Sequence, residues 1–488
     1  MPKNILIFAD GTGQAGGLRP DQVLSNIYKL YRAARTGPDS PIDPTTQIAF
    51  YDPGLGTDPD AGGTPGRLFR SLRKLYSAAT GTGISTNIAD CYEAIVKHYE
   101  PGDRVYLFGF SRGAYTARCV AGVLRLCGVP TTDGGGGPCP HSGRRLRTIC
   151  NEAVSSVYEH GAGKNREEYA PEREEKARRF RTRYGSEGVD ADTSNVAPYF
   201  IGVFDTVAAL GARGLRRFLL VTFLVSAGVV LPVAILARIW GIKAVAAYVA
   251  VVGLAMFGDA LHRRLKVIRD YQASGQCRWH FAGWQSGFYD LTLDPNVRYA
   301  RHALAIDEGR ADFARVGWGF SGDHGPAREA HEPEWFQQIW FSGCHSDIGG
   351  GYAETEARLS DITLDWMVTE ITALRDPVLL DRSKLQLFPS AAGIQHCEVA
   401  SLLDRYPSWW PKALRFGWET LTRREASGAP WHPSVEDRLA LANVAQPSGR
   451  APYRPEALAG DPRVPTADPI STKPGDLDRV AHDSMPNA

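Results

Sequence analysis

Ser111 is the residue in this sequence whose surroundings best suit a nucleophile. It is the third residue of GFSRG, at 109–113, which follows an apolar run at 105–108 and precedes a stretch of helix formers. This order predicts a strand, a sharp turn with the serine at its apex, and a helix. Gly109 and Gly113 suit such a turn, because a Cβ at either position would collide with the neighbouring strand or helix. The positive end of that helix would stabilise the oxyanion that forms when the serine attacks a carbonyl.

Gly-x-Ser-x-Gly between a strand and a helix is typical of the nucleophile elbow of α/β-hydrolases. A serine nucleophile also needs a base within hydrogen-bond distance and an acid that orients the base. We favour His345 as the base, because it follows an apolar strand predicted at 335–342 and lies in a glycine-rich loop. His302 is the best substitute, but it falls inside 296–308, which is predicted to be a helix. The alternative for Ser111 is an ordinary tight turn with an exposed serine.

Asp205 is the favoured triad acid. It ends the apolar strand predicted at 199–204, and the order Ser111, Asp205, His345 is the order that α/β-hydrolases use. Two rival carboxylates are Asp347 and Asp307. Asp347 stands two residues from the base and could instead orient its loop.

The expected oxyanion hole combines two backbone N–H groups. One is that of Arg112, the residue after the nucleophile, and the other comes from a turn after an early strand, where Gly11 and Thr12 are the candidates. An ordinary strand-end turn is the alternative at that place. The glycine-rich loops lack the Gly-Lys-Ser/Thr pattern of a phosphate site, and no His, Cys or carboxylate cluster has metal-ligand spacing. We therefore expect no cofactor and no metal.

Strand and helix patterns alternate along the chain. Such alternation predicts a mostly parallel sheet with helices on both faces, the α/β-hydrolase-like class. The expected strands lie at 4–9, 47–51, 105–108, 199–204 and 335–342, and the expected helices at 22–34, 66–79, 84–99, 164–184, 296–308 and 360–374.

Two apolar stretches interrupt this pattern. Residues 218–237 carry no charge, and 239–258 carry only Lys243. About 20 apolar residues span the hydrocarbon of a bilayer as a helix, so the pair predicts a transmembrane hairpin. Arginines and lysines are concentrated on its outer flanks, which would place both ends on the cytoplasmic side. A helical lid over the active site is the alternative.

The chain is thus predicted to be one hydrolase domain with an insertion. Its net charge of +1 gives no field that would favour nucleic acid, and the eight cysteines are scattered, as expected of reduced thiols. The N-terminal apolar run is too short for a signal peptide. The expected parts are 1–212 and 267–445 for the hydrolase domain, 213–266 for the inserted hairpin and 446–488 for a disordered tail.

Six segments in one order resemble a known family. They are IFADGTG, YDPGLGT, GFSRGAYTAR, GVFDTVAALG, RHALAIDE and CHSDIGGGY, which lie between residues 3 and 375. Together they are similar to the uncharacterised α/β-hydrolase domain family that includes the type VI secretion phospholipase effectors of the first lipase family. The resemblance implies a Ser-Asp-His triad, which by motif position falls on Ser111, Asp205 and His345. The sequence departs from the family pattern at Gln14, Ala15 and Ala208, and none of these removes a catalytic atom.

The expected function is that of a membrane-associated serine hydrolase that cleaves an acyl ester, and the resemblance implies a phospholipid. Its expected partners are membrane lipid and the acyl-ester substrate, with an immunity protein if the chain is a secreted toxin. Two alternatives stay open: an esterase or thioesterase acting on a soluble substrate, and a catalytically idle, membrane-tethered interaction protein. The catalytic domain would lie on the cytoplasmic side of a membrane, or be delivered by type VI secretion.

Overall fold

The computed structural model describes most of the chain outside the apolar stretches. The described residues are 2–11, 14, 16, 23–54, 82–164, 166–190, 192–207, 258, 261, 264–282, 292–313, 315–318, 332–404 and 418–465.

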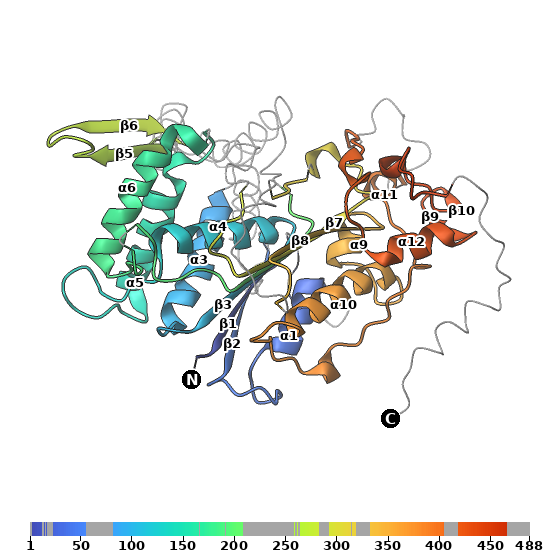
Figure 1. Cartoon of the computed structure of the whole chain (residues 1–488), viewed down its shortest axis with the longest axis horizontal. Helices are drawn as coiled ribbons and strands as arrows, with labels where there is room; N and C mark the ends of the chain where they lie inside the picture. Colours follow the sequence, from blue (N-terminus) through green and yellow to red (C-terminus); the bar gives the residue numbers. More distant parts are fainter. Residues whose placement is uncertain are drawn as a thin grey trace, which may run out of the picture.

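A six-stranded sheet forms the centre of the molecule (Figure 1). Its strand order is β2-β1-β3-β4-β7-β8, and every neighbouring pair is parallel, which confirms the expected α/β class. β2 lies on one side of β1, and all later strands lie on the other side, beginning with β3. The strand order therefore switches between β1 and β3, and their carboxyl ends border the crevice where open α/β sheets bind ligands. The strands are β1 (Asn4–Ala9), β2 (Gln47–Asp52), β3 (Arg104–Phe110), β4 (Phe200–Phe204), β7 (Tyr299–Ala305) and β8 (Phe336–Phe341).

Helices cover both faces of this sheet (Figure 1). One face packs against α3 (Thr82–His98) and α4 (Arg112–Cys127). Outside them, α5 (Gly143–Asn151) packs on α3 and α6 (Arg166–Tyr184) packs on α4. The other face packs against α1 (Asn26–Ala34) and α10 (Arg358–Thr372).

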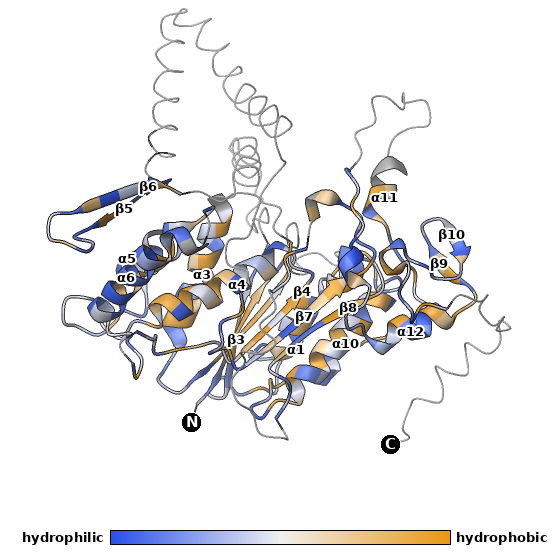
Figure 2. Cartoon of the chain, turned by 45° about the horizontal axis from the view of Figure 1, so that its top comes forward, coloured by the Kyte–Doolittle hydropathy of each residue, from blue (hydrophilic) through white to orange (hydrophobic). Residues whose placement is uncertain are grey.

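The sequence of β1 shows why both faces are covered. Ile5 and Ile7 belong to the core cluster beneath α3 and α4, whereas Leu6 and Phe8 belong to the cluster beneath α1 and α10. Successive side chains of a strand point to opposite faces, so a continuous apolar run requires a helical layer on each side. The central strands β3 and β4 are accordingly drawn mainly in the hydrophobic colour in Figure 2.

Smaller elements surround the sheet. An antiparallel ribbon of β5 (Leu265–Arg269) and β6 (Cys277–Phe281) lies beside α6 (Figure 1). A third core cluster joins the last part of the chain to β7 and β8. The remaining elements are η1 (Glu152–Val157), η2 (Tyr158–Gly161), η3 (Ala311–Phe313), α9 (His345–Gly349), η4 (Arg382–Lys384), α11 (Glu398–Asp404), η6 (Arg424–Ala426), α12 (Pro433–Ala440), β9 (Val444–Gln446), β10 (Gly449–Ala451) and η7 (Glu456–Leu458).

The helix expected at 296–308 is wrong, because most of that segment is the buried strand β7. Its alanines, leucine and arginine favour a helix locally, but pairing with both β4 and β8 overrides that preference. The disordered tail expected from 446 is also wrong in its first part. β10 and η7 lie there, and Tyr453 and Leu458 are fully buried in the third core cluster.

The hairpin expected at 213–266 lies almost entirely outside the described residues, and its last two positions belong to β5. Among the residues that the structure describes, no helix is both long and apolar enough to cross a membrane. The helix expected at 66–79 also falls outside the described ranges.

Candidate active site

Ser111 occupies the turn between β3 and α4 with a backbone conformation that non-glycine residues rarely adopt. Its φ is 59° and its ψ is −121°, and it is the N-cap of α4. The strain is held by the surroundings, because the Ser111 N–H donates to the Phe204 carbonyl at 3.1 Å and its carbonyl accepts from the Tyr115 N–H at 3.2 Å. The serine thus lies at the carboxyl edge of the sheet, at the start of a 16-residue helix.

The glycines on either side of Ser111 allow close backbone contacts. A Cβ on Gly113 would lie 2.0 Å from the Ala9 carbonyl oxygen at the end of β1. A Cβ on Gly109 would lie 2.5 Å from the Gly113 carbonyl oxygen and from the Ala114 Cα. Only glycine fits these positions, so the spacing of GFSRG follows from the packing of α4 against the ends of β1 and β3.

Asp205 and His345 form a buried hydrogen-bonded pair. His345 Nδ1 lies 2.6 Å from Asp205 Oδ2, and the two side chains are 5% and 0% exposed. Asp205 directly follows β4 and has a positive φ of 35°. His345 was expected in a loop, but it is the first residue of the short helix α9, which follows β8. The carboxyl ends of parallel strands meet at one edge of a sheet, which explains how residues 140 positions apart come together.

Arg423 completes this pair, and sequence reasoning missed it. Its Nη1 donates to Asp205 Oδ1 at 2.6 Å and its Nη2 to Asp205 Oδ2 at 3.2 Å, a two-pronged contact from a side chain that is 2% exposed. Burial raises the pKa of the Asp205 carboxyl, but the charge of Arg423 and the hydrogen bond from His345 more than offset it and hold that pKa well below its usual range. Asp205 is therefore ionised at neutral pH.

Glu308 holds the backbone of His345. The His345 N–H donates to Glu308 Oε2 at 3.1 Å, and Arg310 contacts both oxygens of Glu308 at 2.8 and 2.9 Å. Burial raises the pKa of Glu308, but the hydrogen bonds and charge of Arg310 reverse this and lower it. The sequence places Glu308 beside a rival acid, Asp307, and nothing in its spacing indicates a contact 37 residues away.

His345 Nε2, the nitrogen that a base would use, is buried and has no hydrogen-bond partner among the described residues. The hydrogen bond between Ser111 Oγ and this nitrogen is therefore not made in this structure, and such bonds often tighten only when substrate binds. Aromatic rings fix the orientation of the imidazole. The rings of Phe110 and Phe313 lie 4.7 and 5.1 Å from it, measured between centroids.

The rival residues have other contacts. His302 lies on β7 and is fully buried; its Nε2 accepts from the Thr206 N–H at 3.4 Å and its Nδ1 faces Gln338 Oε1 at 3.2 Å. Burial lowers the pKa of His302 to about 3, so it is a neutral structural residue. Asp347 accepts from the His396 ring at 2.7 Å, and Asp307 accepts from Tyr453 and from a backbone N–H.

The oxyanion hole stays a prediction, and two of its three expected residues, Arg112 and Gly11, lie among the described residues. Arg112 is the first residue of α4, and the first amides of a helix have no partner within it. Gly11 lies close to the serine, since a Cβ on it would be 3.5 Å from the Ser111 Cβ. Its N–H, however, donates to Asp10 Oδ1 at 2.7 Å. Thr12 lies outside the described residues.

The parallel sheet and its helical layers make the chain an α/β protein, with a strained serine and a buried Asp–His pair at the carboxyl edge. Residues 3–370 match the family model described as T6SS, Phospholipase effector Tle1-like, catalytic domain. The chain belongs to that family, which confirms the resemblance seen in its motifs.

The chain is also similar to other known proteins. An uncharacterized protein of Saccharomyces cerevisiae is 35% identical over 130 residues, which are 26% of this chain and 18% of that protein. The crystal structure of an uncharacterized protein from Pseudomonas aeruginosa is 16% identical, with a TM-score of 0.33, over 80% of this chain and 48% of that one. The structure of the Tle1 effector bound to the VgrG spike is 16% identical, with a TM-score of 0.29, over 74% and 53%. The chain spans about half of these two structures and under a fifth of the yeast protein.

Proposed function

We propose that this chain is a serine hydrolase that cleaves the acyl ester of a phospholipid through Ser111, His345 and Asp205. The observation that carries the proposal is the buried contact of 2.6 Å between His345 and Asp205 at the sheet edge where Ser111 stands in a strained turn. Membership of the phospholipase effector family supports the substrate class.

The reaction follows from these positions. Ser111 Oγ attacks the ester carbonyl carbon while His345 Nε2 takes the hydroxyl proton, and the ionised Asp205 stabilises the imidazolium through Nδ1. The Arg112 N–H, at the positive end of α4, stabilises the oxyanion, and Gly11 supplies the second donor once its N–H turns from Asp10. His345 then protonates the departing alcohol oxygen. Water, deprotonated by His345, finally releases the fatty acid from Ser111.

The location of the enzyme is part of the same proposal. We infer that the apolar segment at 213–266 holds the catalytic site at a lipid surface, which raises the local concentration of substrate. The family is one of type VI secretion effectors, which supports delivery by that route. An immunity protein would then protect the producing cell. Deletion of 213–258 should abolish co-flotation with liposomes while labelling of Ser111 persists.

A fluorophosphonate probe tests the nucleophile directly. Wild-type protein should be labelled and Ser111→Ala should not, whereas Ser401→Ala, on the exposed side of α11, should label like the wild type. Release of fatty acid from phospholipid vesicles should follow the same pattern, with Ser111→Ala lowering the rate by at least about 10³-fold. Turnover of short soluble esters without any release from vesicles would favour a soluble substrate instead. Labelling that survives in Ser111→Ala would refute the assignment.

A further inference from the structure

A second cluster of titratable side chains lies far from Ser111 in the sequence and on other elements. It consists of His160 on η2, Glu172 on α6 and His280 on β6, which are 0%, 6% and 8% exposed. Its residues come from the helical layer and from the β5–β6 ribbon, which lies beside α6 in Figure 1. Polar groups buried to this degree need a partner of strong affinity to offset their desolvation.

The three side chains converge on one point. His160 Nε2 lies 2.9 Å from Glu172 Oε2, and the two imidazole rings are 4.7 Å apart at 86°. The ligand atoms that the three residues offer all lie within 4.8 Å of one another. Ligands at about 2.0–2.2 Å from a tetrahedral metal ion lie roughly 3.3 Å apart, so small side-chain rotations would bring them to that spacing.

Both histidines are in the form that a metal ion requires. His280 Nε2 lies 2.6 Å from the His160 carbonyl oxygen, which can only accept, so that nitrogen carries the proton and Nδ1 keeps a lone pair. His160 Nδ1 is buried without a hydrogen-bond partner among the described residues.

We propose that His160, Glu172 and His280 bind a divalent cation of the Zn²⁺ class. Two imidazoles and one carboxylate are a ligand set that Zn²⁺ and Co²⁺ accept, with water as the fourth ligand, whereas Mg²⁺ and Ca²⁺ prefer oxygen alone. When His160 binds the ion through Nε2, the ring proton that faces Glu172 moves to Nδ1, which has no partner among the described residues, so no net proton is released.

The surroundings orient these ligands. Arg278 donates to Glu172 Oε1 at 3.2 Å and leaves Oε2 facing His160, and the His160 carbonyl fixes the ring of His280. Contacts of this kind hold metal ligands in place in known sites. Burial and the positive charge of Lys176 lower the pKa of His160, so Lys176 is a like charge that a bound cation would meet.

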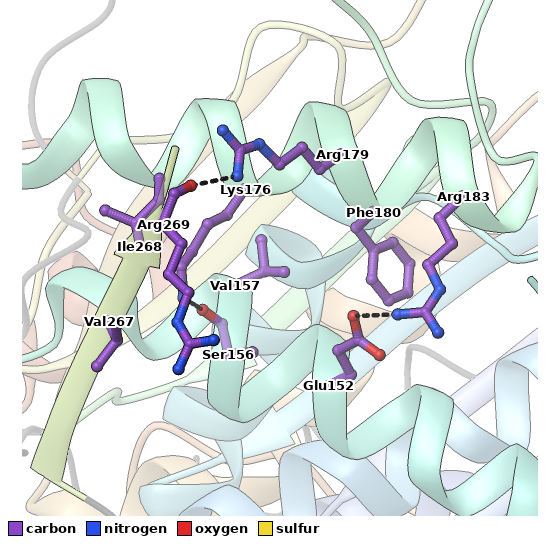
Figure 3. A pocket seen from close by; sticks show the side chains of 10 residues that line it. All are labelled: Glu152, Ser156, Val157, Lys176, Arg179, Phe180, Arg183, Val267, Ile268 and Arg269. Carbon is purple, nitrogen blue, oxygen red and sulfur yellow. Dashed lines mark hydrogen bonds and ion pairs between the residues drawn. The ribbon is translucent and has the colours of Figure 1, made fainter. Parts of the chain in front are cut away.

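Lys176 extends into the wall of an adjoining pocket of about 270 Å³, where its Nζ donates to the Ser156 carbonyl at 3.0 Å (Figure 3). Lys164 also bears on His280, and it is exposed to solvent.

The site would serve to hold the ribbon. His280 is the one buried residue of the five in β6, so the docking of that strand depends on it. The ribbon begins at Leu265, and a bound cation would fix it against the helical layer. No metal site is predicted from the sequence, because 12 and 120 residues separate His160 from the other two ligands.

Metal binding by the full-length chain tests the proposal. Protein purified with a tag free of histidine, stripped with EDTA and dialysed, should bind one equivalent of Zn²⁺ by elemental analysis after gel filtration. Co²⁺ should give the strong visible absorption of a tetrahedral site, and Zn²⁺ should displace it whereas Mg²⁺ should not. Zn²⁺ at a hundredfold excess over its Kd should raise the Tm by about 3 °C.

Variants locate the ion. Glu172→Gln and His280→Ala should each weaken Zn²⁺ binding by at least about 10²-fold, and His141→Ala, at an exposed histidine, should bind like the wild type. Zn²⁺ should also protect residues 265–282 of the wild type from proteolysis, a readout that requires no variant. A stripped wild type that takes up less than about 0.1 equivalent at micromolar Zn²⁺, or cluster variants that bind like the wild type, would overturn the proposal and leave a hydrogen-bonded structural cluster.

Discussion

Arg423 provides the sharpest test of the site, because it contacts the proposed acid and not the proposed nucleophile. Arg423→Met keeps the apolar stem and removes the guanidinium. Asp205 would then keep the His345 ring and the Ala305 N–H, at 3.1 Å, as its partners, at a position that is fully buried. An ionised carboxylate with less compensation in such a place lowers the stability of the folded state.

The size of the effect follows from the burial of both partners. Breaking a buried ion pair by removing one side costs about 3–5 kcal/mol. An unfolding entropy of about 2 cal/mol/K per residue gives about 1 kcal/mol/K for 488 residues, so the Tm should fall by about 3–5 °C. Since Arg423 also orients Asp205, kcat on vesicles should fall by about 10²-fold with KM little changed.

The neighbouring arginine is a matched control. Arg424 pairs with Glu456 at 3.3 Å, and these side chains are 79% and 68% exposed. Arg424→Met should therefore change the free energy of unfolding by less than about 0.5 kcal/mol and leave kcat unchanged.

A double-mutant cycle isolates the contact itself. Asp205→Asn and Arg423→Met should each destabilise the protein, and the double variant should be less destabilised than their sum by about 2 kcal/mol or more, measured by denaturant unfolding at pH 7. The pKa of Asp205 is lowered on folding, so its contribution is present above pH 4 and is lost as the pH falls further. A coupling energy below about 0.5 kcal/mol would refute the argument that Arg423 compensates the charge of Asp205.

Three further outcomes test the packing around the site. Gly113→Ala should lower the free energy of unfolding by about 3 kcal/mol, although alanine has the better helix propensity, because the new Cβ would lie 2.0 Å from the Ala9 carbonyl oxygen. Gly309→Ala is the control: a Cβ there would meet only one atom, at 4.0 Å, so the same melting experiment should show no change in stability. The pKa of His302 falls to about 3 on folding, so the free energy of unfolding of the wild type should fall by about 2 kcal/mol between pH 7 and pH 5, where the unfolded state takes up a proton. A His302→Gln variant whose stability falls by the same amount would contradict this. Tyr453→Phe removes a hydrogen bond of 2.7 Å to the buried carboxyl of Asp307, whose pKa burial raises to about 6. The variant should lose about 1–2 kcal/mol of stability in urea unfolding, and more at pH 8, where the carboxyl is ionised, than at pH 5.

Local patterns in the sequence predicted the elements that depend on local interactions. The strand, turn and helix around Ser111 follow from five residues, and the strands at 4–9 and 47–52 follow from apolar runs. The pairing of Asp205 with His345 was also predictable as a hypothesis, because both residues come directly after predicted strands and parallel strands end at one edge. These features need no information from distant parts of the chain.

The remaining features depend on contacts that no short pattern records. RHALA is a strand because β4 and β8 flank it, and the same residues would suit a helix. Arg423 lies 218 residues from its partner in a segment of ordinary composition, and His280 is the buried residue of a short, otherwise exposed strand. The role of a buried charge or imidazole becomes visible only in the tertiary structure, where the side chain that pairs with it can be identified.

The position of Arg423 bears on where the catalytic unit ends. The family match stops at residue 370, yet the guanidinium that contacts Asp205 comes from beyond it. The third core cluster explains how that side chain is held, since Trp431, Val435 and Leu458 pack with residues of β7 and β8, the strands that precede Glu308 and His345. The segment at 418–465 is therefore joined to the site by an apolar core on one side and a buried ion pair on the other. A hydrolase domain cut at the end of the family match would retain the three proposed catalytic side chains but lose the charge that balances the acid.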